Sequence, residues 1–268
     1  MTGDSFRVHV LASGSKGNAV LIGAGRTTIM IDAGISARRL DRELGKLGLR
    51  AGDLSGIFIT HEHTDHVKGL PVFVEKSQVQ VFAREETWLA LEGLRKIHSG
   101  CRRLLPMQES AVGDLSIRPF AVSHDAAAPV GFNIFYRRRK CSLATDLGFA
   151  GEEVKAALSG SDVLIIEANH DEKMLASGCY PPAMKKRISG GQGHLSNAQA
   201  GRLLAEVYGG KKTQVFLAHL SQENNRPELA QKTVADILAA RGAVGAISIY
   251  VTSQDGLVSN CGRESDVQ

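Results

Sequence analysis

The stretch Thr60–Leu70, THEHTDHVKGL, places three histidines and an aspartate within six residues. It follows the apolar run Gly56–Ile59, which reads as a short strand. His61 and His63 lie two residues apart, so on an extended segment they point to the same side. The aspartate and the third histidine follow where the chain turns towards a helix. Imidazole and carboxylate ligands suit zinc, iron and manganese, so the stretch predicts two adjacent divalent metal ions rather than a plain polar loop.

Other predicted strands also end at a residue that can bind a metal or orient a ligand. In chain order these residues are Asp32, His61, His124, Asp146, Glu167 and His219. Segments with helical spacing lie between many of the strands, and Ser36 and Ser196 are the expected N-caps of two helices. This alternation predicts an α/β fold whose strand ends share one edge, where such sheets bind ligands. A lone histidine such as His124 is usually structural, and it gains weight here because the first cluster still lacks ligands.

The rest of the sequence predicts two further helices and one irregular segment. Val67–Lys76 and Arg84–His98 read as helices, whereas Glu172–Gly193 is irregular and basic and is expected to face the substrate. The residues from Gly256 onwards are small and polar, and we expect them to fray. No repeat, low-complexity tract or linker divides the sequence, so residues 1–268 are expected to form a single domain.

Two segments are candidates for contact with phosphate groups. The loop Ala12–Asn18, ASGSKGN, either lets backbone N–H groups approach a phosphate or forms a plain hairpin turn, and the sequence leaves both open. The second candidate is the basic part of the irregular stretch. The predicted substrate-binding residues are Ser13, Ser15, Asn18, Lys185, Lys186 and Arg187. The basic run Arg137–Lys140 reads instead as an exposed turn.

Composition excludes some classes and leaves others open. The chain has 268 residues, 43% of them apolar and 5% aromatic, and a formal net charge of +4. This mild positive charge is compatible with a phosphate-rich substrate without establishing one. The four cysteines form no CxxC pair, which argues against a zinc ribbon or a redox dithiol. We find no signal peptide and no membrane span, and we expect a cytoplasmic protein with reduced thiols.

These residues, in this order, resemble the motifs of the metallo-β-lactamase superfamily. The HxHxDH pattern is His61–His66, preceded by Asp32 and followed by single residues at His124, Asp146 and His219. The match spans almost the whole chain. It implies an α/β fold of a particular kind, a four-layered αββα sandwich with the metals at one edge.

The resemblance also implies a role for each matching residue. The first metal would be held by His61, His63 and His124, and the second by Asp65, His66 and His219. Asp146 would bridge the two metals, and Asp32 would support a ligand from behind. Zinc or manganese is expected, and iron is compatible with the same set. Because His63 is intact, the flavodiiron type of chemistry, reduction of oxygen or nitric oxide, is disfavoured.

A narrower resemblance concerns three segments. LASGSKGN at Leu11–Asn18, IIEANHD at Ile165–Asp171 and YPPAMKKRISGGQGHLSN at Tyr180–Asn197 look like the YycJ group of small bacterial enzymes, which are described as DNA exonucleases. Members of that group often have an aromatic residue where Pro182 stands here. Glu167 and His194 look like the glutamate–histidine pair of related tRNA-maturing nucleases, whose long tRNA-gripping arm has no counterpart in this sequence.

The resulting hypothesis is hydrolysis of a phosphodiester, with DNA favoured among nucleic acid substrates. A metal-bridging hydroxide would attack phosphorus, and Asp65 would accept the water's proton. His194, oriented by Glu167, would protonate the departing sugar oxygen. A lactam or thioester needs no such pair, so the pair favours phosphodiesters.

Three alternatives stay open at the level of sequence. They are a small-molecule cyclic phosphodiesterase, a lactone or thioester hydrolase of the same fold, and a non-catalytic DNA- or protein-binding module stabilised by metal. No motif of the sequence indicates from which end a DNA strand would be degraded, or the oligomeric state of the protein.

Overall fold

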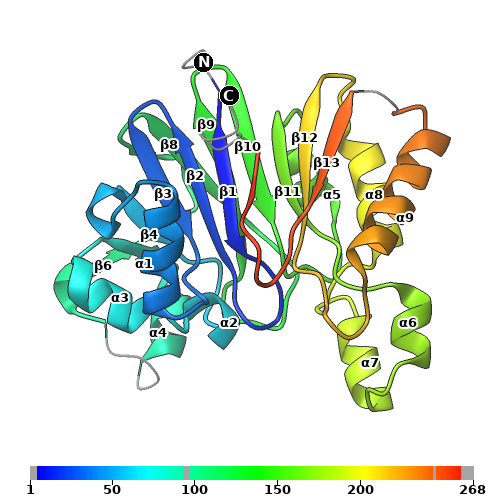
Figure 1. Cartoon of the computed structure of the whole chain (residues 1–268), viewed down its shortest axis with the longest axis horizontal. Helices are drawn as coiled ribbons and strands as arrows, with labels where there is room; N and C mark the ends of the chain where they lie inside the picture. Colours follow the sequence, from blue (N-terminus) through cyan, green and yellow to red (C-terminus); the bar gives the residue numbers. More distant parts are fainter. Residues whose placement is uncertain (1–4, 93–96, 244–245, 261–268) are drawn as a thin grey trace.

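Two β-sheets lie face to face and are covered on their outer sides by helices. The computed structural model describes residues 5–92, 97–243 and 246–260. Figure 1 shows the sheets in the middle of the molecule, with one group of helices on each side. This arrangement confirms the predicted four-layered αββα sandwich.

The first sheet is built mostly from the N-terminal half of the chain. Its strands are β1 (Arg7–Ala12), β2 (Ala19–Ala24), β3 (Thr27–Ile31), β4 (Gly56–Phe58), β5 (Val81–Ala83), β6 (Arg102–Leu104) and β14 (Val258–Ser259). The spatial order is β14-β1-β2-β3-β4-β5-β6. The strands from β3 to β6 run parallel, so β3 and β4 end at the same edge.

The second sheet comes from the C-terminal half. Its strands are β7 (Ser110–Val112), β8 (Leu115–Ala121), β9 (Val130–Tyr136), β10 (Arg139–Ala144), β11 (Val163–Glu167), β12 (Thr213–Ala218) and β13 (Ile247–Val251). The order is β13-β12-β11-β10-β9-β8-β7. Strands β10 to β13 are parallel, and β8 has the same direction because β9 is antiparallel to both β8 and β10.

Helices cover the outer face of each sheet. Over the first sheet lie α1 (Ala37–Lys46), α3 (Leu70–Ser77) and α4 (Glu85–Leu91), and over the second lie α5 (Glu152–Leu158), α8 (Asn197–Val207) and α9 (Pro227–Ala240). The short helices α2 (Thr64–Val67), α6 (Glu172–Ser177) and α7 (Pro182–Ile188) lie near the lower edge in Figure 1. None of the helices in the described residues is long and apolar enough to cross a lipid bilayer.

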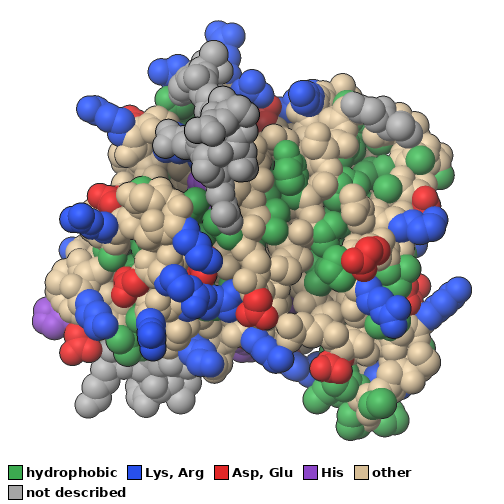
Figure 2. Space-filling view, viewed as in Figure 1, with side chains coloured by type: hydrophobic (Ala, Val, Ile, Leu, Met, Phe, Trp, Pro, Cys, Tyr) green, Lys and Arg blue, Asp and Glu red, His purple; other side chains and the backbone are tan. Residues whose placement is uncertain are grey.

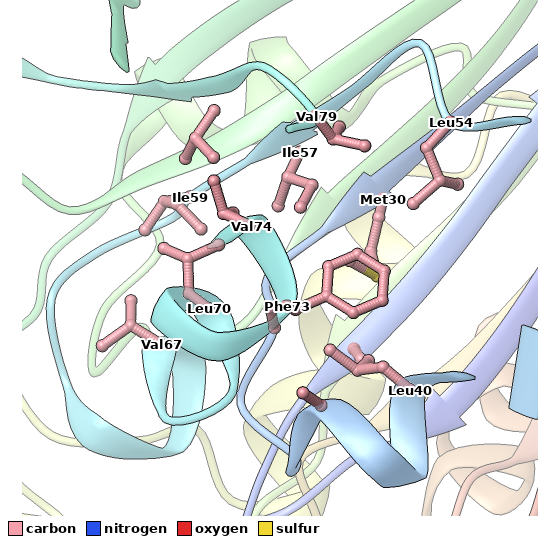
Figure 3. Packing of buried hydrophobic residues seen from close by; sticks show 14 of the residues in the cluster. Met30, Leu40, Leu54, Ile57, Ile59, Val67, Leu70, Phe73, Val74 and Val79 are labelled. Atoms are coloured by element: carbon pink, nitrogen blue, oxygen red, sulfur yellow. The ribbon is translucent and has the colours of Figure 1, made fainter. Parts of the chain in front are cut away.

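Three apolar clusters correspond to the three interfaces between the four layers. The cluster between the sheets includes Val8, Phe58, Phe132 and Phe216. Each of the other two clusters lies between one sheet and the helices that cover it. Figure 3 shows the cluster of the first sheet, where side chains of α3, such as Phe73, pack against residues of the strands. Burial of these apolar surfaces is the main favourable contribution to folding.

The predicted N-caps are confirmed at two helices. The side chain of Ser36 accepts a hydrogen bond from the backbone N–H of Arg39 at the start of α1. Ser196 and Gln199 form a reciprocal capping box at the start of α8. Each cap satisfies backbone N–H groups that have no partner inside the helix.

Several predicted element boundaries were wrong. The helix predicted over Val67–Lys76 is divided, because α2 ends at Val67 and α3 begins after Gly69, whose N–H donates to the carbonyl of Ala33. The helix predicted over Arg84–His98 ends at Leu91, and residues 93–96 lie outside the described part of the chain.

Two segments are more regular than predicted. The stretch Glu172–Gly193 is not irregular, since it contains α6 and α7. The tail from Gly256 was predicted to fray, yet Val258 and Ser259 pair with β1. Residues 261–268 lie outside the described part.

Candidate metal centre

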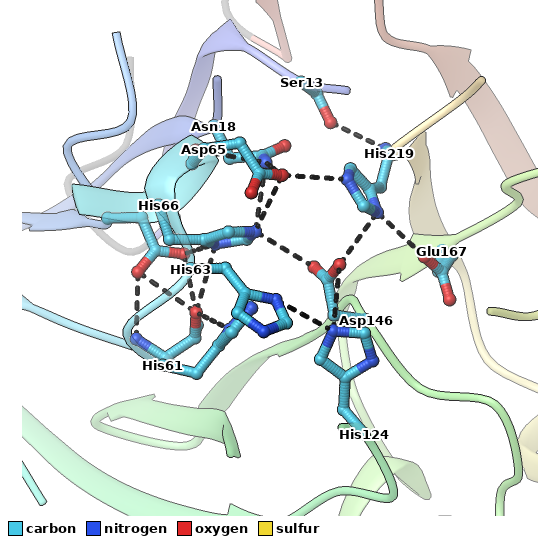
Figure 4. A network of polar contacts seen from close by, with 12 residues as sticks. Ser13, Asn18, His61, His63, Asp65, His66, His124, Asp146, Glu167 and His219 are labelled. Atoms are coloured by element: carbon cyan, nitrogen blue, oxygen red, sulfur yellow. Dashed lines mark hydrogen bonds and ion pairs between the residues drawn. The ribbon is translucent and has the colours of Figure 1, made fainter. Parts of the chain in front are cut away.

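Six strand ends converge on one site at the edge of both sheets. The residues that follow or end β3, β4, β8, β10, β11 and β12 are Asp32, His61, His124, Asp146, Glu167 and His219. Figure 4 shows the side chains of His61, His124, Asp146, Glu167 and His219 in one polar network, and Asp32 joins this network through its contact with His66. The two halves of the chain therefore contribute to a single site, as the strand-end pattern predicted.

Three of these residues have a backbone conformation that is uncommon outside glycine. Asp32, Asp146 and His219 have φ values of 59°, 56° and 55°. Aspartate and histidine are enriched in this left-handed region relative to most other side chains, although it still costs free energy. Each turn occurs at the end of a parallel strand, where Asp146 contacts His219 and His66, and Asp32 contacts His66.

His61, His63 and His124 form the first group of possible ligands. One ring nitrogen from each lies within 4.8 Å of the others. Nδ1 of His63 is 3.3 Å from Nε2 of His124. Nδ1 of His61 contacts the hydroxyl of Thr60 at 3.0 Å, and its Nε2 is buried without a hydrogen-bond partner in the described residues.

Asp65, His66 and His219 form the second group. Oδ2 of Asp65 lies 3.4 Å from Nε2 of His66 and 3.5 Å from Nε2 of His219. His66 and His219 are buried, and Asp65 is partly exposed. The Nε2 atom of His219 has no hydrogen-bond partner in the described part of the chain.

Asp146 lies between the two groups. Its Oδ2 is 3.3 Å from Nε2 of His66, and its Oδ1 is 3.9 Å from Nε2 of His124. The side chain is buried, and its Oδ2 has no hydrogen-bond partner among the described residues. A carboxylate in this position can contact ions held by either group.

Behind these groups, Asp32 fixes the orientation of His66. Oδ2 of Asp32 lies 2.8 Å from Nδ1 of His66, which leaves Nε2 facing Asp65 and Asp146. Thr60 donates its backbone N–H and its hydroxyl to Asp32. Sequence reasoning missed Thr60, whose only signal was its place directly before the histidine cluster.

Glu167 contacts two histidines through one oxygen. Its Oε1 lies 2.8 Å from Nδ1 of His194 and 2.9 Å from Nδ1 of His219. Its Oε2 accepts the backbone N–H groups of Leu147 and Leu195. The pair of Glu167 and His194 expected from the sequence is therefore in contact, and Glu167 also orients His219.

The buried carboxylates give the site a strong preference for positive charge. Burial acts to lower the pKa of His66, but the carboxylates of Asp146, Asp32 and Asp65 outweigh it and raise the pKa well above its usual value. Burial also opposes protonation of His219, yet Asp146, Asp65 and Glu167 raise its pKa to about 10. Divalent cations would supply the positive charge that these protons carry.

The donor atoms fit divalent metal ions. Three buried atoms, Nε2 of His61, Oδ2 of Asp146 and Nε2 of His219, have no hydrogen-bond partner in the described residues, and each belongs to a group of possible ligand atoms that lie within 4.8 Å of one another. Such unpaired buried atoms are unfavourable without an ion or water. Ligand histidines usually have their second nitrogen held by a carboxylate or hydroxyl, as His66, His219 and His61 do here. The residues present therefore suit a divalent metal centre.

The predicted phosphate-contacting residues of the N-terminal loop have different environments. The hydroxyl of Ser13 is buried and accepts the backbone N–H of His219. The Asn18 amide is buried and contacts Asp65 and His66. Ser15 is exposed and borders the cavity over the metal-site residues. Ser13 and Asn18 thus support the site from behind, and Ser15 faces the cavity.

The predicted basic residues lie on or next to α7. Nζ of Lys185 donates to the carbonyl of Ala176, and Nε of Arg187 donates to Oδ2 of Asp125 at 2.6 Å. Arg187 borders the cavity over the metal-site residues, which has a volume of about 210 Å³. Tyr180 and Met184 border it too. Sequence reasoning named the segment that contains them but did not select either residue.

A sequence model of a protein family matches the part of the chain that contains the site. The model described as "Beta-lactamase superfamily domain" matches residues 27–220. This span runs from β3 to just beyond His219 and so includes each strand end of the site. The chain belongs to the β-lactamase superfamily.

Two bacterial proteins named exodeoxyribonucleases are similar to most of the chain. Exodeoxyribonuclease YycJ of Bacillus anthracis is 37% identical over 235 residues, which cover 87% of this chain and 89% of that protein. Exodeoxyribonuclease WalJ of Streptococcus pneumoniae is 36% identical over 256 residues, covering 93% of this chain and 95% of that protein.

A solved structure supports the fold. The metallo-β-lactamase fold protein YhfI from Bacillus subtilis superimposes with a TM-score of 0.73, covering 95% of this chain and 99% of its own, at 14% sequence identity. Similarity at this level of sequence identity shows that the two proteins share a fold. It gives no information about the substrate.

Proposed function

We propose that this protein is a metal-dependent exodeoxyribonuclease that uses two divalent cations. The observation that carries the proposal is the geometry around Asp146. Two groups of three possible ligands flank this carboxylate, and the contacting pair of Glu167 and His194 lies beside it. The overall similarity to proteins named exodeoxyribonucleases supports DNA as the substrate.

The two cations would occupy the two groups of ligands. The first ion would be held by His61, His63 and His124, the second by Asp65, His66 and His219, and Asp146 would contact both. Such a pair, when bound, activates water at neutral pH and neutralises charge on phosphate oxygens. Nitrogen and carboxylate donors are compatible with zinc, manganese or iron. Because the ligands come from both sheets, we propose that residues 1–268 work as one domain.

His194 is proposed to protonate the departing sugar oxygen. Burial acts to lower the pKa of His194, but the carboxylate of Glu167 outweighs it and raises the pKa above its usual value, which favours the protonated ring that an acid needs. Because Nδ1 faces Glu167, Nε2 is the nitrogen left to donate to a substrate. His194 also borders the cavity over the metal-site residues, where a substrate has access to it.

Asp65 is proposed to bind a metal and to orient the attacking water. Burial favours its neutral form, but His66 and His219 outweigh this and hold the pKa of the carboxyl well below its usual value. The carboxylate is therefore charged at neutral pH and can accept a hydrogen bond from water. Asp65 would orient the water so that a lone pair of the water oxygen points towards phosphorus. It would not hold the proton that the water loses.

The surroundings of the site favour a polymer over a small substrate. The cavity at the metal-site residues adjoins two larger hollows and shares Arg187 with one and His124 with the other. The face in Figure 2 also carries many Lys and Arg side chains over α1 and α3 and near the lower edge. A polyanion can lie along such a surface, and its binding would weaken as the salt concentration rises.

The test is a nuclease assay with metal-loaded protein. End-labelled single-stranded and duplex DNA are incubated with Mn²⁺ or Zn²⁺, and covalently closed circular DNA serves as the control. The proposal expects mononucleotides released from one end and intact circles. Nicked circles would indicate an endonuclease, and intact linear DNA and RNA with every metal would overturn the nuclease proposal.

A further inference from the structure

A groove next to the metal-site residues has a basic side and an acidic side. One hollow of about 730 Å³ is bordered by Asp125, Phe149, Lys186, Arg187 and residues 190–192. A second, of about 490 Å³, shares Ser123, Phe149 and Gln192 with the first and is also bordered by Glu152 and Glu153. Phe149 therefore stands at the boundary between the two hollows.

The ring of Phe149 is unusually exposed for its position. It is 62% exposed, three residues after the buried Asp146. Among the large apolar side chains that are exposed in the described residues, it is the only aromatic one. Single exposed apolar residues are common on proteins. This one, however, borders both hollows beside the candidate catalytic residues.

The loop that carries Phe149 is held in place by the site itself. The backbone N–H of Leu147 donates to Glu167, and that of Gly148 donates to the carbonyl of Ser123. Gly148 lies so close to the next segment that a Cβ there would be 2.4 Å from the carbonyl oxygen of Gly190. The backbone just before Phe149 is therefore held close to the site, and the ring extends from it into solvent.

Charge determines on which side of the ring a phosphate can lie. Lys186 has no ion pair among the described residues, whereas Arg187 is held by Asp125. Glu152 and Glu153 on the other side would repel a phosphate. A strand whose phosphates follow Lys186 and Arg187 can place a base over Phe149. Proteins that bind single strands combine a basic track with an aromatic platform in this way.

We propose that Phe149 stacks on an unpaired nucleobase of the DNA strand, next to the phosphate that is cleaved. This inference rests on the proposed function and adds to it. Inside a duplex both faces of a base are covered by the neighbouring pairs, whereas in a single strand a base can expose its face to the ring. The protein is therefore expected to bind a single-stranded end with a lower KM than a blunt duplex end.

The test compares Phe149→Ala and Phe149→Trp with Leu104→Ala as a matched control. Leu104 is 65% exposed on β6 and borders neither hollow. With single-stranded DNA, Phe149→Ala is expected to raise KM by about 10-fold or more with little change in kcat, since base stacking on an aromatic ring has that magnitude. Phe149→Trp should retain the wild-type KM, and Leu104→Ala should not change it.

Abasic substrates identify stacking directly. An abasic site at the stacked position should raise KM for the wild type and add nothing further in Phe149→Ala. The stacking role would be overturned if the abasic site and Phe149→Ala raised KM independently and additively, or if Phe149→Ala had the same kinetics as Leu104→Ala. Neither result would refute the proposed function. A wild type that degrades no DNA would instead refute the proposed function. If Phe149→Ala had a lower molecular mass in solution than the wild type and an unchanged KM, the ring would instead contact a second copy of the protein.

Discussion

At the scale of single residues, one carboxylate links two different tasks. Oε1 of Glu167 contacts His194, the proposed acid, and His219, a proposed ligand, with nearly equal distances of 2.8 and 2.9 Å. Replacing Glu167 would therefore disturb both protonation and metal binding. Replacing His194 leaves the two groups of three ligands complete, so His194 is the better position at which to test acid catalysis.

His194→Ala is expected to reduce turnover of DNA by roughly 10²- to 10⁴-fold, the usual contribution of a general acid. Metal content should remain that of the wild type. The p-nitrophenyl ester of thymidine 5′-phosphate should show a much smaller loss, because p-nitrophenolate leaves without a proton. An equal loss on both substrates would contradict the role as an acid, and loss of metal would make His194 a ligand.

Metal uptake is expected to release protons from the site. In the metal-free protein His219 has a pKa of about 10, and that of His66 is also raised. Both rings are protonated at neutral pH and must lose those protons to bind a metal, so metal affinity rises with pH. Calorimetry of Zn²⁺ binding near pH 7 in buffers of different ionisation enthalpy measures the release.

The control for proton release is Asp32→Asn. It removes a carboxylate that lies 2.8 Å from the His66 ring and holds its proton, so this variant should release fewer protons than the wild type. A binding enthalpy that is independent of the buffer would contradict the expectation.

Ligand-type residues were the easiest to predict from sequence, and residues that act through shape were the hardest. The motif His61–His66 and the strand-end residues were visible because their chemistry is unusual in apolar surroundings. Phe149 is one phenylalanine among nine, and only its exposure in the folded chain distinguishes it. Ser13 and Asn18 were selected as phosphate contacts, yet their side chains are used inside the protein.

At the scale of elements, the loop after β3 supports the helix that carries Asp65 and His66. The backbone of Ala33 donates to the carbonyl of His66, and Asn18 donates to that of Asp65. Gly34 lies against this helix, and a Cβ on it would be only 1.6 Å from the carbonyl oxygen of Asp65. The absence of a side chain at Gly34 thus permits the close approach of the two segments.

Gly34→Ala is expected to destabilise the protein by about 3 kcal/mol or to displace α2, because a rigid backbone cannot avoid the added atom. Metal content should fall together with stability. The matched control is Gly45→Ala within α1, where a Cβ meets nothing within 4 Å. That change should stabilise by about 0.5–1 kcal/mol, since alanine favours a helix more than glycine does. Denaturant unfolding and elemental analysis of both variants provide the test, and equal stabilities would contradict the packing argument.

Strands with continuous apolar runs were predictable, and breaks in helices were not. Strand β4, for example, covers Gly56–Phe58 of the predicted run Gly56–Ile59. The division between α2 and α3 results from the contact of Gly69 with Ala33, which are far apart in the sequence. Val258 and Ser259 pair with β1 through a similarly distant contact. Local periodicity contains no information about such pairings.

At the scale of the whole molecule, the site joins the two sheets. His61 and Asp65 belong to the N-terminal half, whereas His124, Asp146 and His219 follow strands of the second sheet. Ions bound between them would act as cross-links between the halves. A ligand that binds only the folded state raises its stability according to its affinity and concentration.

Removal of metal is therefore expected to lower the Tm on the order of 10 °C, if the ions were present at about a thousand times their dissociation constant. Differential scanning calorimetry of chelator-treated and reloaded protein measures the shift. Asp146→Asn should show a smaller recovery on reloading, because it weakens the contact shared by both ions. A Tm that is the same with and without measured metal would show that the halves are joined by packing alone.

The left-handed turns at Asp32, Asp146 and His219 have a consequence for protein engineering. Glycine adopts this conformation without the penalty that other residues incur, so each substitution to glycine would relieve local strain. A directed-evolution campaign that rewards heat resistance in the presence of a chelator would be expected to enrich glycine at these three corners. The resulting proteins would be more robust and inert, whereas asparagine at the two aspartate positions would keep the turn, remove the charge and replace one acceptor oxygen with a donor.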